Sequence, residues 1–328
     1  MGAFQTMKKI SLAATCAAAL VITGCDKEND DPGVAESNVA QVVVNSNDFT
    51  LLEAAVIKAG LVNALSNTAN LTVFAPDDAA FRSLDLNGDG TPDLDTEAKI
   101  NALDAAGTAL LTKVLNYHVL GMRVPAASVP AGPNASVESL DGENIFATRN
   151  ANGVFINGIP VQTADIAASN GVIHRIGRVL IPSGGQNIVQ VASANPNFTY
   201  LVAAVVKAGE SGTDVAGALS AAGPLTVFAP TNQAFIAAGF PTIASIQAAD
   251  PNTLRDILLN HVVAARVFSS DLTEGAAPAS AGGGDLTITL AGGAKVRGEG
   301  NTAASSIVMP NVLASNGVIH VIDAVLLP

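Results

Sequence analysis

An internal repeat constrains this chain more than any other feature. Three segments occur twice, in the same order and about 150 residues apart: FTLLEAAVIKAG at 49–60 and FTYLVAAVVKAG at 198–209, LTVFAP at 71–76 and 225–230, and ASNGVIH at 168–174 and 314–320. The spacing matches the length of one ordinary domain. We therefore predict two copies of one fold, at residues 36–183 and 184–328, with Ser183-Gly184-Gly185 as a short flexible joint.

Each copy begins with a helical pattern and ends with strand-like runs. Leu52, Val56 and Ala59 recur at helical spacing, and Gly60 stands where such a helix would end. After Val124, short runs rich in Val, Ile, Phe and Thr alternate with turn pairs that tolerate positive φ. These pairs are Asp141-Gly142, Asn152-Gly153, Asn157-Gly158 and Asn170-Gly171. The pattern predicts an α+β fold, with a mostly antiparallel sheet flanked by helices in each copy.

Charge and cysteine content narrow the classes of function. Lys and Arg number 16 against 28 Asp and Glu, so the formal net charge is −12. That field repels polyanions, and we expect no nucleic-acid partner. The only cysteines are Cys16 and Cys25, so no disulfide framework supports the body of the protein. Its stability must come from apolar burial and backbone hydrogen bonds.

The N-terminal segment is typical of a targeting signal. Met7-Lys8-Lys9 precedes an apolar run over residues 10–22, which is shorter than the ~20 residues that span a bilayer. The run ends in Val21-Ile22-Thr23-Gly24-Cys25, which resembles a bacterial lipobox. The resemblance implies that residues 1–24 are a signal peptide, that Cys25 is lipidated, and that residues 25–35 are a flexible tether to a membrane. An ordinary signal peptide with a chance cysteine is the alternative.

The tether adds an expectation about location. Its acidic stretch Asp26–Asp31 is similar to the signal that sends lipoproteins of Bacteroidetes-type bacteria to the outer face of the outer membrane. We therefore expect an outer-membrane lipoprotein of the cell envelope, displayed on the cell surface.

The repeated motifs resemble those of the fasciclin (FAS1) domain. In the first copy the resemblance lies in TVFAP at 72–76, Ala80-Phe81, Asn116-Tyr117-His118 and NGVIHRI at 170–176. The second copy repeats it in TVFAP at 226–230, Ala234-Phe235, Asn260-His261 and NGVIHVI at 316–322. The family resemblance implies a β-wedge flanked by helices in each domain. It also implies an extracellular adhesion or matrix-binding role, with an extracellular protein or polysaccharide as partner.

All the histidines fall in these motifs: His118, His174, His261 and His320. The resemblance implies that the pair Tyr117-His118 contributes to binding, whereas Asn260 replaces the tyrosine in the second copy. The alternative, which we favour for Tyr117, is that it packs at a helix end with its hydroxyl hydrogen-bonded. Two interpretations stay open for the histidines. They could contact a ligand or act in catalysis, or they could be half-buried imidazoles that hydrogen-bond the backbone, which is the interpretation we favour.

No catalytic motif accompanies them. The sequence contains no Gly-x-Ser-x-Gly elbow, HExxH or Walker A segment, so we predict a non-enzymatic protein. The alternative is an envelope protein that binds or hydrolyses a small ligand through His118 or His174. A structural spacer that presents no specific surface is a third interpretation.

One acidic segment occurs only in the first copy. Residues 85–97, DLNGDGTPDLDTE, resemble a calcium loop of the D-x-N-x-D-G type. Hard cations prefer such oxygen donors, supplied here by Asp85, Asn87, Asp89, Asp93 and the Thr91 carbonyl. Thr96 stands where an EF-hand has its glutamate, and a solvated acidic insertion is the alternative. Calcium is thus the one cofactor that we expect.

Overall fold

The computed structural model describes residues 37–85 and 90–328. The predicted signal peptide, Cys25 and the tether lie outside these residues, as do Asn87 and Asp89 of the acidic segment. Among the described residues, no helix is long and apolar enough to cross a membrane.

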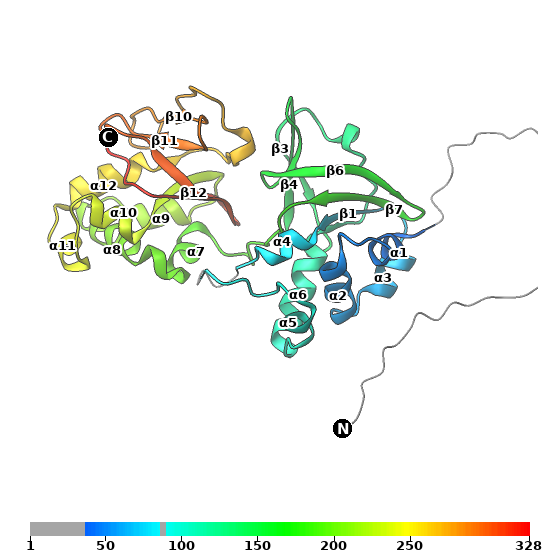
Figure 1. Ribbon diagram of the computed structural model, residues 1–328. Coiled ribbons are helices and arrows are strands. Elements are labelled where there is room, and N and C mark those ends of the chain that lie inside the picture. Colours follow the sequence, from blue (N-terminus) through cyan, green and yellow to red (C-terminus); the bar gives the residue numbers. More distant parts are fainter. Residues whose placement is uncertain (1–36, 86–89) are drawn as a thin grey trace, which may run out of the picture. The chain divides into compact units, whose positions relative to one another are not determined.

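The first copy forms helices before most of its strands. Its helices are α1 (Val39–Val44), α2 (Thr50–Lys58), α3 (Val62–Asn67), α4 (Asp78–Arg82), α5 (Glu97–Asn101) and α6 (Ala105–Tyr117). Its strands are β1 (Leu71–Pro76), β2 (Val119–Leu120), β3 (Gly132–Glu138), β4 (Asn144–Asn150), β5 (Gly153–Ile156), β6 (Ile159–Ala168) and β7 (Gly171–Ile176). In Figure 1 the helices α1, α2 and α3 lie together on one side of strands β1 and β7.

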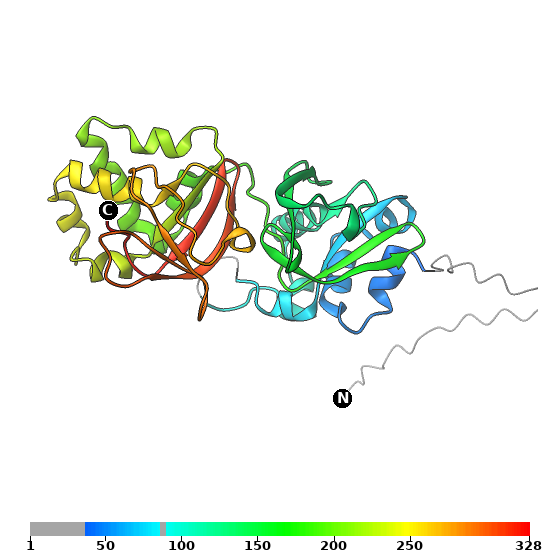
Figure 2. The ribbon, with the colours of Figure 1, turned by 90° about the horizontal axis from the view of Figure 1, so that it is seen from above.

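The second copy repeats this order. Its helices are α7 (Ile188–Ala194), α8 (Thr199–Ala208), α9 (Val215–Ser220), α10 (Asn232–Ala237), α11 (Ile243–Gln247) and α12 (Pro251–Asn260). Its strands are β8 (Leu225–Pro230), β9 (Val262–Val263), β10 (Thr287–Thr289), β11 (Lys295–Arg297), β12 (Ser305–Ala314) and β13 (Gly317–Ile322). Figure 2 shows its green-to-yellow helices grouped beside its orange and red strands.

The repeated motifs form two adjacent inner strands of each sheet, next to the short edge strand β2 or β9. The strand orders are β2-β1-β7-β6-β5-β4-β3 in the first copy and β10-β11-β12-β13-β8-β9 in the second. The LTVFAP strand pairs in parallel with the NGVIH strand in both, so Phe74 lies opposite His174 and Phe228 opposite His320. The other pairings between the named strands are antiparallel. The predicted α+β class with two mostly antiparallel sheets is confirmed.

The Asn-Gly pairs do not all act as positive-φ turns. Gly142, Gly153 and Gly158 have positive φ, as expected of tight turns. Asn170 and Gly171 do not. A Cβ on Gly171 would instead lie 2.4 Å from the Leu71 carbonyl oxygen, and one on Gly317 would lie 2.2 Å from that of Leu225. In the NGVIH motif, glycine therefore permits close approach of the parallel neighbour.

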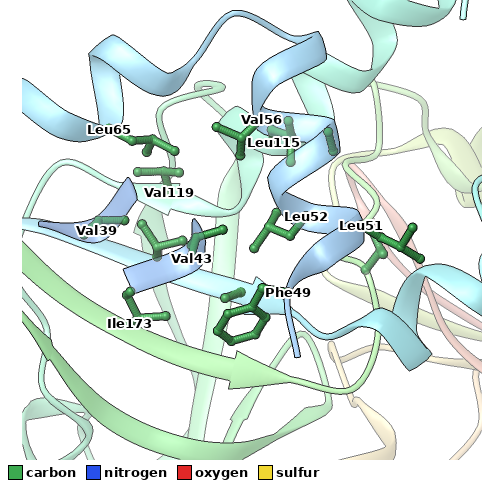
Figure 3. Packing of buried hydrophobic residues seen from close by; sticks show 14 of the residues in the cluster. Val39, Val43, Phe49, Leu51, Leu52, Val56, Leu65, Leu115, Val119 and Ile173 are labelled. Carbon is green, nitrogen blue, oxygen red and sulfur yellow. The ribbon is translucent and has the colours of Figure 1, made fainter. Parts of the chain in front are cut away.

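Each domain buries apolar side chains on both faces of its sheet. Figure 3 shows the helical side of the first domain, where Leu52 and Val56 of α2 lie near Leu115, Val119 and Ile173. A second cluster, which includes Phe74, Tyr117 and Ile145, fills the other side. The second domain has two corresponding clusters. Burial of these side chains supplies the main favourable free energy of folding in a chain without disulfides in its body.

Candidate functional site

His118 and His261 occupy the same place in the two domains. Each caps the C-terminus of a helix, α6 or α12. The Nδ1–H of His118 donates to the Val114 carbonyl at 2.7 Å, and its Nε2 accepts from the Leu180 amide at 2.9 Å. His261 makes the same two bonds, at 2.7 Å to Ile257 and 2.9 Å from Leu326. Each imidazole therefore joins a helix end to the segment that follows the last strand.

Burial fixes the charge of these two rings. Desolvation lowers the pKa of His118 and of His261 to about 4, although the hydrogen bond to a backbone carbonyl acts in the opposite direction. Both are neutral at pH 7. A neutral ring with one donor and one acceptor nitrogen matches the two backbone partners that each histidine has.

His174 and His320 form the second matched pair. The Nε2–H of His174 donates to the Val124 carbonyl at 2.9 Å, and its Nδ1 accepts from the Asp165 amide at 3.2 Å. His320 repeats this with Val267 at 2.8 Å and Asn311 at 3.3 Å. Desolvation lowers the pKa of His320 to about 4. All the motif histidines thus use both ring nitrogens inside the fold, as the structural interpretation requires.

Tyr117 is also inside the first domain. Its side chain is 0% exposed, and its hydroxyl donates to the Asn144 carbonyl and accepts from Asn157 Nδ2, both at 2.9 Å. Desolvation raises the pKa of this hydroxyl. Neither Tyr117 nor His118 reaches the surface of the folded domain, so the binding role predicted for the pair stays a prediction. The geometry gives both residues a supporting role.

A cavity of about 270 Å³ lies beside α6 in the first domain. Its walls are mostly apolar, and they include Phe81, Leu94, Leu103, Leu111 and Ile181. Asp93 and His118 also line it, which brings a motif histidine and a carboxylate to one concave site. Because both nitrogens of His118 have backbone partners, the ring has no free nitrogen for acid–base chemistry there. The cavity suits an apolar occupant better than a reacting polar one.

The acidic segment joins α4 to α5. Asp85 Oδ2 accepts from the Gly90 amide at 2.8 Å, and Lys99 pairs with Asp95 at 2.8 Å. Among the residues that the structure describes, no group of three or more His, Cys, Asp or Glu side chains is arranged to hold a metal ion. Because Asn87 and Asp89 lie outside the described residues, calcium binding by Asp85, Asn87, Asp89, Thr91 and Asp93 stays a prediction.

The motif asparagines were not predicted to have a role, yet each connects three parts of its domain. Asn170 accepts from the Val39 amide and donates to the Leu65 and Thr68 carbonyls, at 2.8–2.9 Å. Asn316 does the same with Ile188, Leu219 and Ala221 at 2.8–3.0 Å. Their preservation in both copies was the available signal, but the sequence does not reveal partners about 100 residues away.

These features define a class of protein with two consecutive copies of one helix-and-sheet domain. In each copy, buried histidines and an asparagine connect the same helices and strands. A family model of the fasciclin domain matches residues 47–182 and 196–328. The chain therefore belongs to the fasciclin family, and both copies are FAS1 domains.

Relatives with related sequences occur in animals and bacteria. Human periostin is 28% identical over 254 residues, covering 77% of this chain and 27% of periostin. Pig transforming growth factor-beta-induced protein ig-h3 is 29% identical over 265 residues, covering 80% of this chain and 35% of that protein. This chain thus spans about a third or less of either relative. Protein sll1483 of Synechocystis is 42% identical over 144 residues, covering 44% of this chain and 73% of the relative.

A solved structure is similar as well. The FAS1 domain pair of the insect cell adhesion molecule fasciclin I matches with a TM-score of 0.39 and 18% identity, covering 85% of this chain and 96% of that one.

Proposed function

We propose that this chain is a non-catalytic adhesion or matrix-binding protein of the cell envelope, built from two FAS1 domains. The observation that carries the proposal is the use of the motif histidines. Both ring nitrogens of each are hydrogen-bonded to backbone within the fold, in both copies. A histidine so bonded has no nitrogen left to move a proton to or from a substrate. Family membership adds the expectation of an extracellular protein or polysaccharide as partner.

The adhesion role is tested with cells that lack the gene. We expect the deletion strain to lose attachment to a matrix-coated surface, and the parent gene to restore it. A His118→Asn, His174→Asn double variant that still folds should restore attachment as well, because those rings serve the fold. Unchanged adhesion in the deletion strain would contradict the proposal. Loss of a hydrolytic activity in a folded histidine variant would favour the hydrolytic alternative.

The proposal includes a lipid anchor at Cys25. The lipobox-like segment Val21–Cys25 and the polar tether behind it support this part. Each buried CH₂ of an acyl chain contributes ~0.8 kcal/mol, so several chains on one residue hold a protein stably at a membrane. Metabolic labelling with a palmitate analogue should mark the parent and not Cys25→Ser, which should also leave the membrane fraction. Protease treatment of intact cells then distinguishes surface display from a periplasmic orientation.

The cavity beside α6 favours a second candidate function, binding of a small ligand. The lining is mostly apolar, so a compact neutral apolar molecule fits it. The neutral probe N-phenyl-1-naphthylamine should gain fluorescence on binding. Leu103→Trp, which fills the cavity, should abolish that gain, and Leu290→Trp, in the second domain, should not. Equal fluorescence in all three proteins would contradict this candidate.

A further inference from the structure

The two FAS1 domains contact each other through a set of residues, several of which differ between the copies. In the second domain, the contact residues follow β9, in Arg266 and the short 3-10 helix η4 (Ser269–Asp271), and lie at Asn311 in β12. In the first domain they belong to β3, β4 and the turn after β5. The contact thus joins strands β3 and β4 and the turn after β5 in the first domain to a loop and a strand of the second domain.

Two aromatic rings and a guanidinium that lies over one of them form the middle of this contact. The Arg266 guanidinium lies over the Phe146 ring, with its carbon 4.2 Å from the ring centroid. Phe268, which is 0% exposed, packs against the same ring at a centroid distance of 5.9 Å. The guanidinium also donates to the Gly317 carbonyl at 2.9 Å. The guanidinium is held in one orientation by carbonyl oxygens and an aromatic face, so this contact is directional and not a nonspecific hydrophobic one.

Polar bonds surround these rings. Asn311 Nδ2 donates to the Gly158 carbonyl at 3.3 Å, and Thr148 Oγ1 donates to Asp271 at 3.0 Å. Asn134 Nδ2 donates to the Arg266 carbonyl at 2.7 Å. Asn150 Nδ2 donates to the Ser270 carbonyl at 3.1 Å. Four such bonds fix one relative orientation, because each needs its own distance and direction.

Tyr117 supports the first domain's side of the contact from behind. Its hydroxyl accepts from Asn157 Nδ2, and Asn157 Oδ1 accepts from the Phe146 amide at 2.8 Å. Gly158, the acceptor for Asn311, is the next residue along the chain. The buried tyrosine therefore positions both the ring that Arg266 covers and the turn that Asn311 contacts. It touches no residue of the second domain through a hydrogen bond itself.

The two copies differ at these positions. Ala147 pairs with Ile156 in the first sheet as Ile288 pairs with Val296 in the second, which places Thr287 where Phe146 stands. Asn260 replaces Tyr117. The second domain therefore lacks the ring and the supporting tyrosine that make the docking face.

The first domain in turn lacks two of the docking groups, although Arg123 stands where Arg266 does. Pro125 replaces Phe268, and Asp165 replaces Asn311. Asp165 keeps the internal bond of Asn311, since each accepts from an amide of the following short helix, Ala126 at 2.9 Å or Ser269 at 2.8 Å. It has no side-chain N–H to offer. A head-to-tail contact between like surfaces would propagate into an open array, but here each copy carries one of the two faces only.

The connection between the domains is also held. Ser183, predicted as part of a flexible joint, is buried, and its amide and hydroxyl donate to Glu143 Oε2 at 2.8 and 2.7 Å. Lys113 lies 3.3 Å from the other oxygen of Glu143. The end of the first domain is thus anchored to the strand region that precedes the docking face.

We propose that the two FAS1 domains of this chain dock as one rigid body through this contact, with Tyr117 as a positioning residue for the docking face. The partner of the face around Phe146 and Gly158 is the second domain of the same chain. This explains why the tyrosine is present in the first copy: that copy carries the face on which the second domain docks. The inference does not depend on an adhesive role.

Distances between spin labels test the proposal in the full chain. Cys16 and Cys25 are replaced by serine, and labelled cysteines are introduced at the exposed positions Asn63 and Val206, one in each domain. We expect double electron–electron resonance to give a single narrow distribution of distances between the two labels. Labelled chains diluted into unlabelled ones should give the same distribution, because the contact lies within one chain.

The two copies supply matched variants. Phe146→Thr and Asn311→Asp install the residue that the other copy carries, so each should fold, and each should broaden the distribution. Tyr117→Phe should broaden it too. The reciprocal exchange Asp165→Asn lies outside the contact and should leave the narrow peak, with circular dichroism melting as the check on folding. A broad distribution in the parent, a peak lost on dilution, or variants as narrow as the parent would overturn the proposal.

Discussion

At the scale of single residues, this protein shows how a buried polar side chain can find all its hydrogen-bond partners in the backbone of the fold. An imidazole carries one donor and one acceptor when neutral, and each motif histidine finds one carbonyl and one amide. Leaving either partner unsatisfied would cost about 1–3 kcal/mol. Because both ring nitrogens are hydrogen-bonded within the fold, these residues are hard to replace. For the same reason neither nitrogen is available for proton transfer with a substrate.

Stability should depend on pH through these rings. The folded-state pKa is about 4 for His118, His261 and His320, below the ordinary value of 6.5. The unfolded chain therefore binds more protons between pH 6.5 and 4, and the free energy of unfolding falls as pH falls through that window. We expect a loss of about 2 kcal/mol per histidine at pH 5.

Urea unfolding at pH 7.5, 6 and 5 measures this effect. Two of the three rings lie in the second domain, so its transition should move more than that of the first. A flat stability between pH 7.5 and 5 would contradict the prediction.

The Tyr117 hydroxyl should contribute measurably to stability. Tyr117→Phe removes a buried group that bonds Asn144 and Asn157, and we expect a loss of about 1–3 kcal/mol in the free energy of unfolding. Tyr200→Phe is the matched control, because its hydroxyl makes one exposed bond, at 3.3 Å to Pro241. That variant should stay within about 0.5 kcal/mol of the parent. Equal effects in denaturant unfolding would contradict the supporting role of Tyr117.

At the scale of elements, the repeated motifs correspond to one piece of architecture. LTVFAP and NGVIH lie far apart in sequence and form a pair of parallel inner strands in each sheet. Parallel neighbours need a crossover between them, here made of helices and the remaining strands. Each of these strands has a neighbouring strand on both of its edges and is mostly buried, which explains why these segments changed least between the copies.

A single methyl group should disturb this pair. The Cβ of Gly171→Ala would lie 2.4 Å from the Leu71 carbonyl oxygen, which belongs to the neighbouring strand and cannot turn away. We expect a loss of about 2 kcal/mol in stability. Gly121→Ala is the control, since its Cβ meets only Leu140 Cδ2 at 3.5 Å. Thermal unfolding of both variants decides the point, and a Gly171→Ala protein as stable as Gly121→Ala would refute the packing argument.

The loop between α4 and α5 carries the calcium prediction. If residues 85–97 hold the ion, millimolar Ca²⁺ should raise the melting temperature of the first domain, because a ligand that binds only the folded state stabilises it. The second domain is an internal control: α10 ends at Ala237 and α11 begins at Ile243, so it has no such insertion. A calorimetric response that is flat, or equal in both domains, would contradict calcium binding at this loop.

The helices, the strands and their duplication could be predicted from the sequence better than the contacts between segments far apart in the chain. Helical spacing around Leu52 and Val56 and the repeated blocks were enough to predict the class and the duplication, and the resemblance of the repeated motifs indicated the family. The Asn170-Gly171 pair was expected to form a positive-φ turn, and that reason for the glycine was wrong. Glycine is needed there because Gly171 lies against the backbone of Leu71, about 100 residues earlier in the chain. The partners of the Tyr117 hydroxyl and the anchoring of Ser183 were missed, because hydrogen bonds between distant segments leave no local pattern.

At the scale of the whole molecule, the acidic charge governs encounters with surfaces. The formal net charge of −12 repels anionic polysaccharide and lipid at long range. The Debye length shortens from about 30 Å at 0.01 M salt to about 8 Å at 0.15 M, so the repulsion weakens as salt is added. Adhesion that uses short-range contacts should therefore strengthen with ionic strength, the opposite of a basic protein.

Binding to an alginate-coated sensor at increasing NaCl measures this. We expect the bound amount to rise from 0.01 to 0.15 M salt, roughly as the screening length falls. A neutral dextran surface should show little salt dependence, because no long-range repulsion opposes approach to it. Binding to alginate that decreases with salt would mean that a local basic patch, rather than the net charge, controls the encounter. The acidic surface would then have no part in selecting the partner.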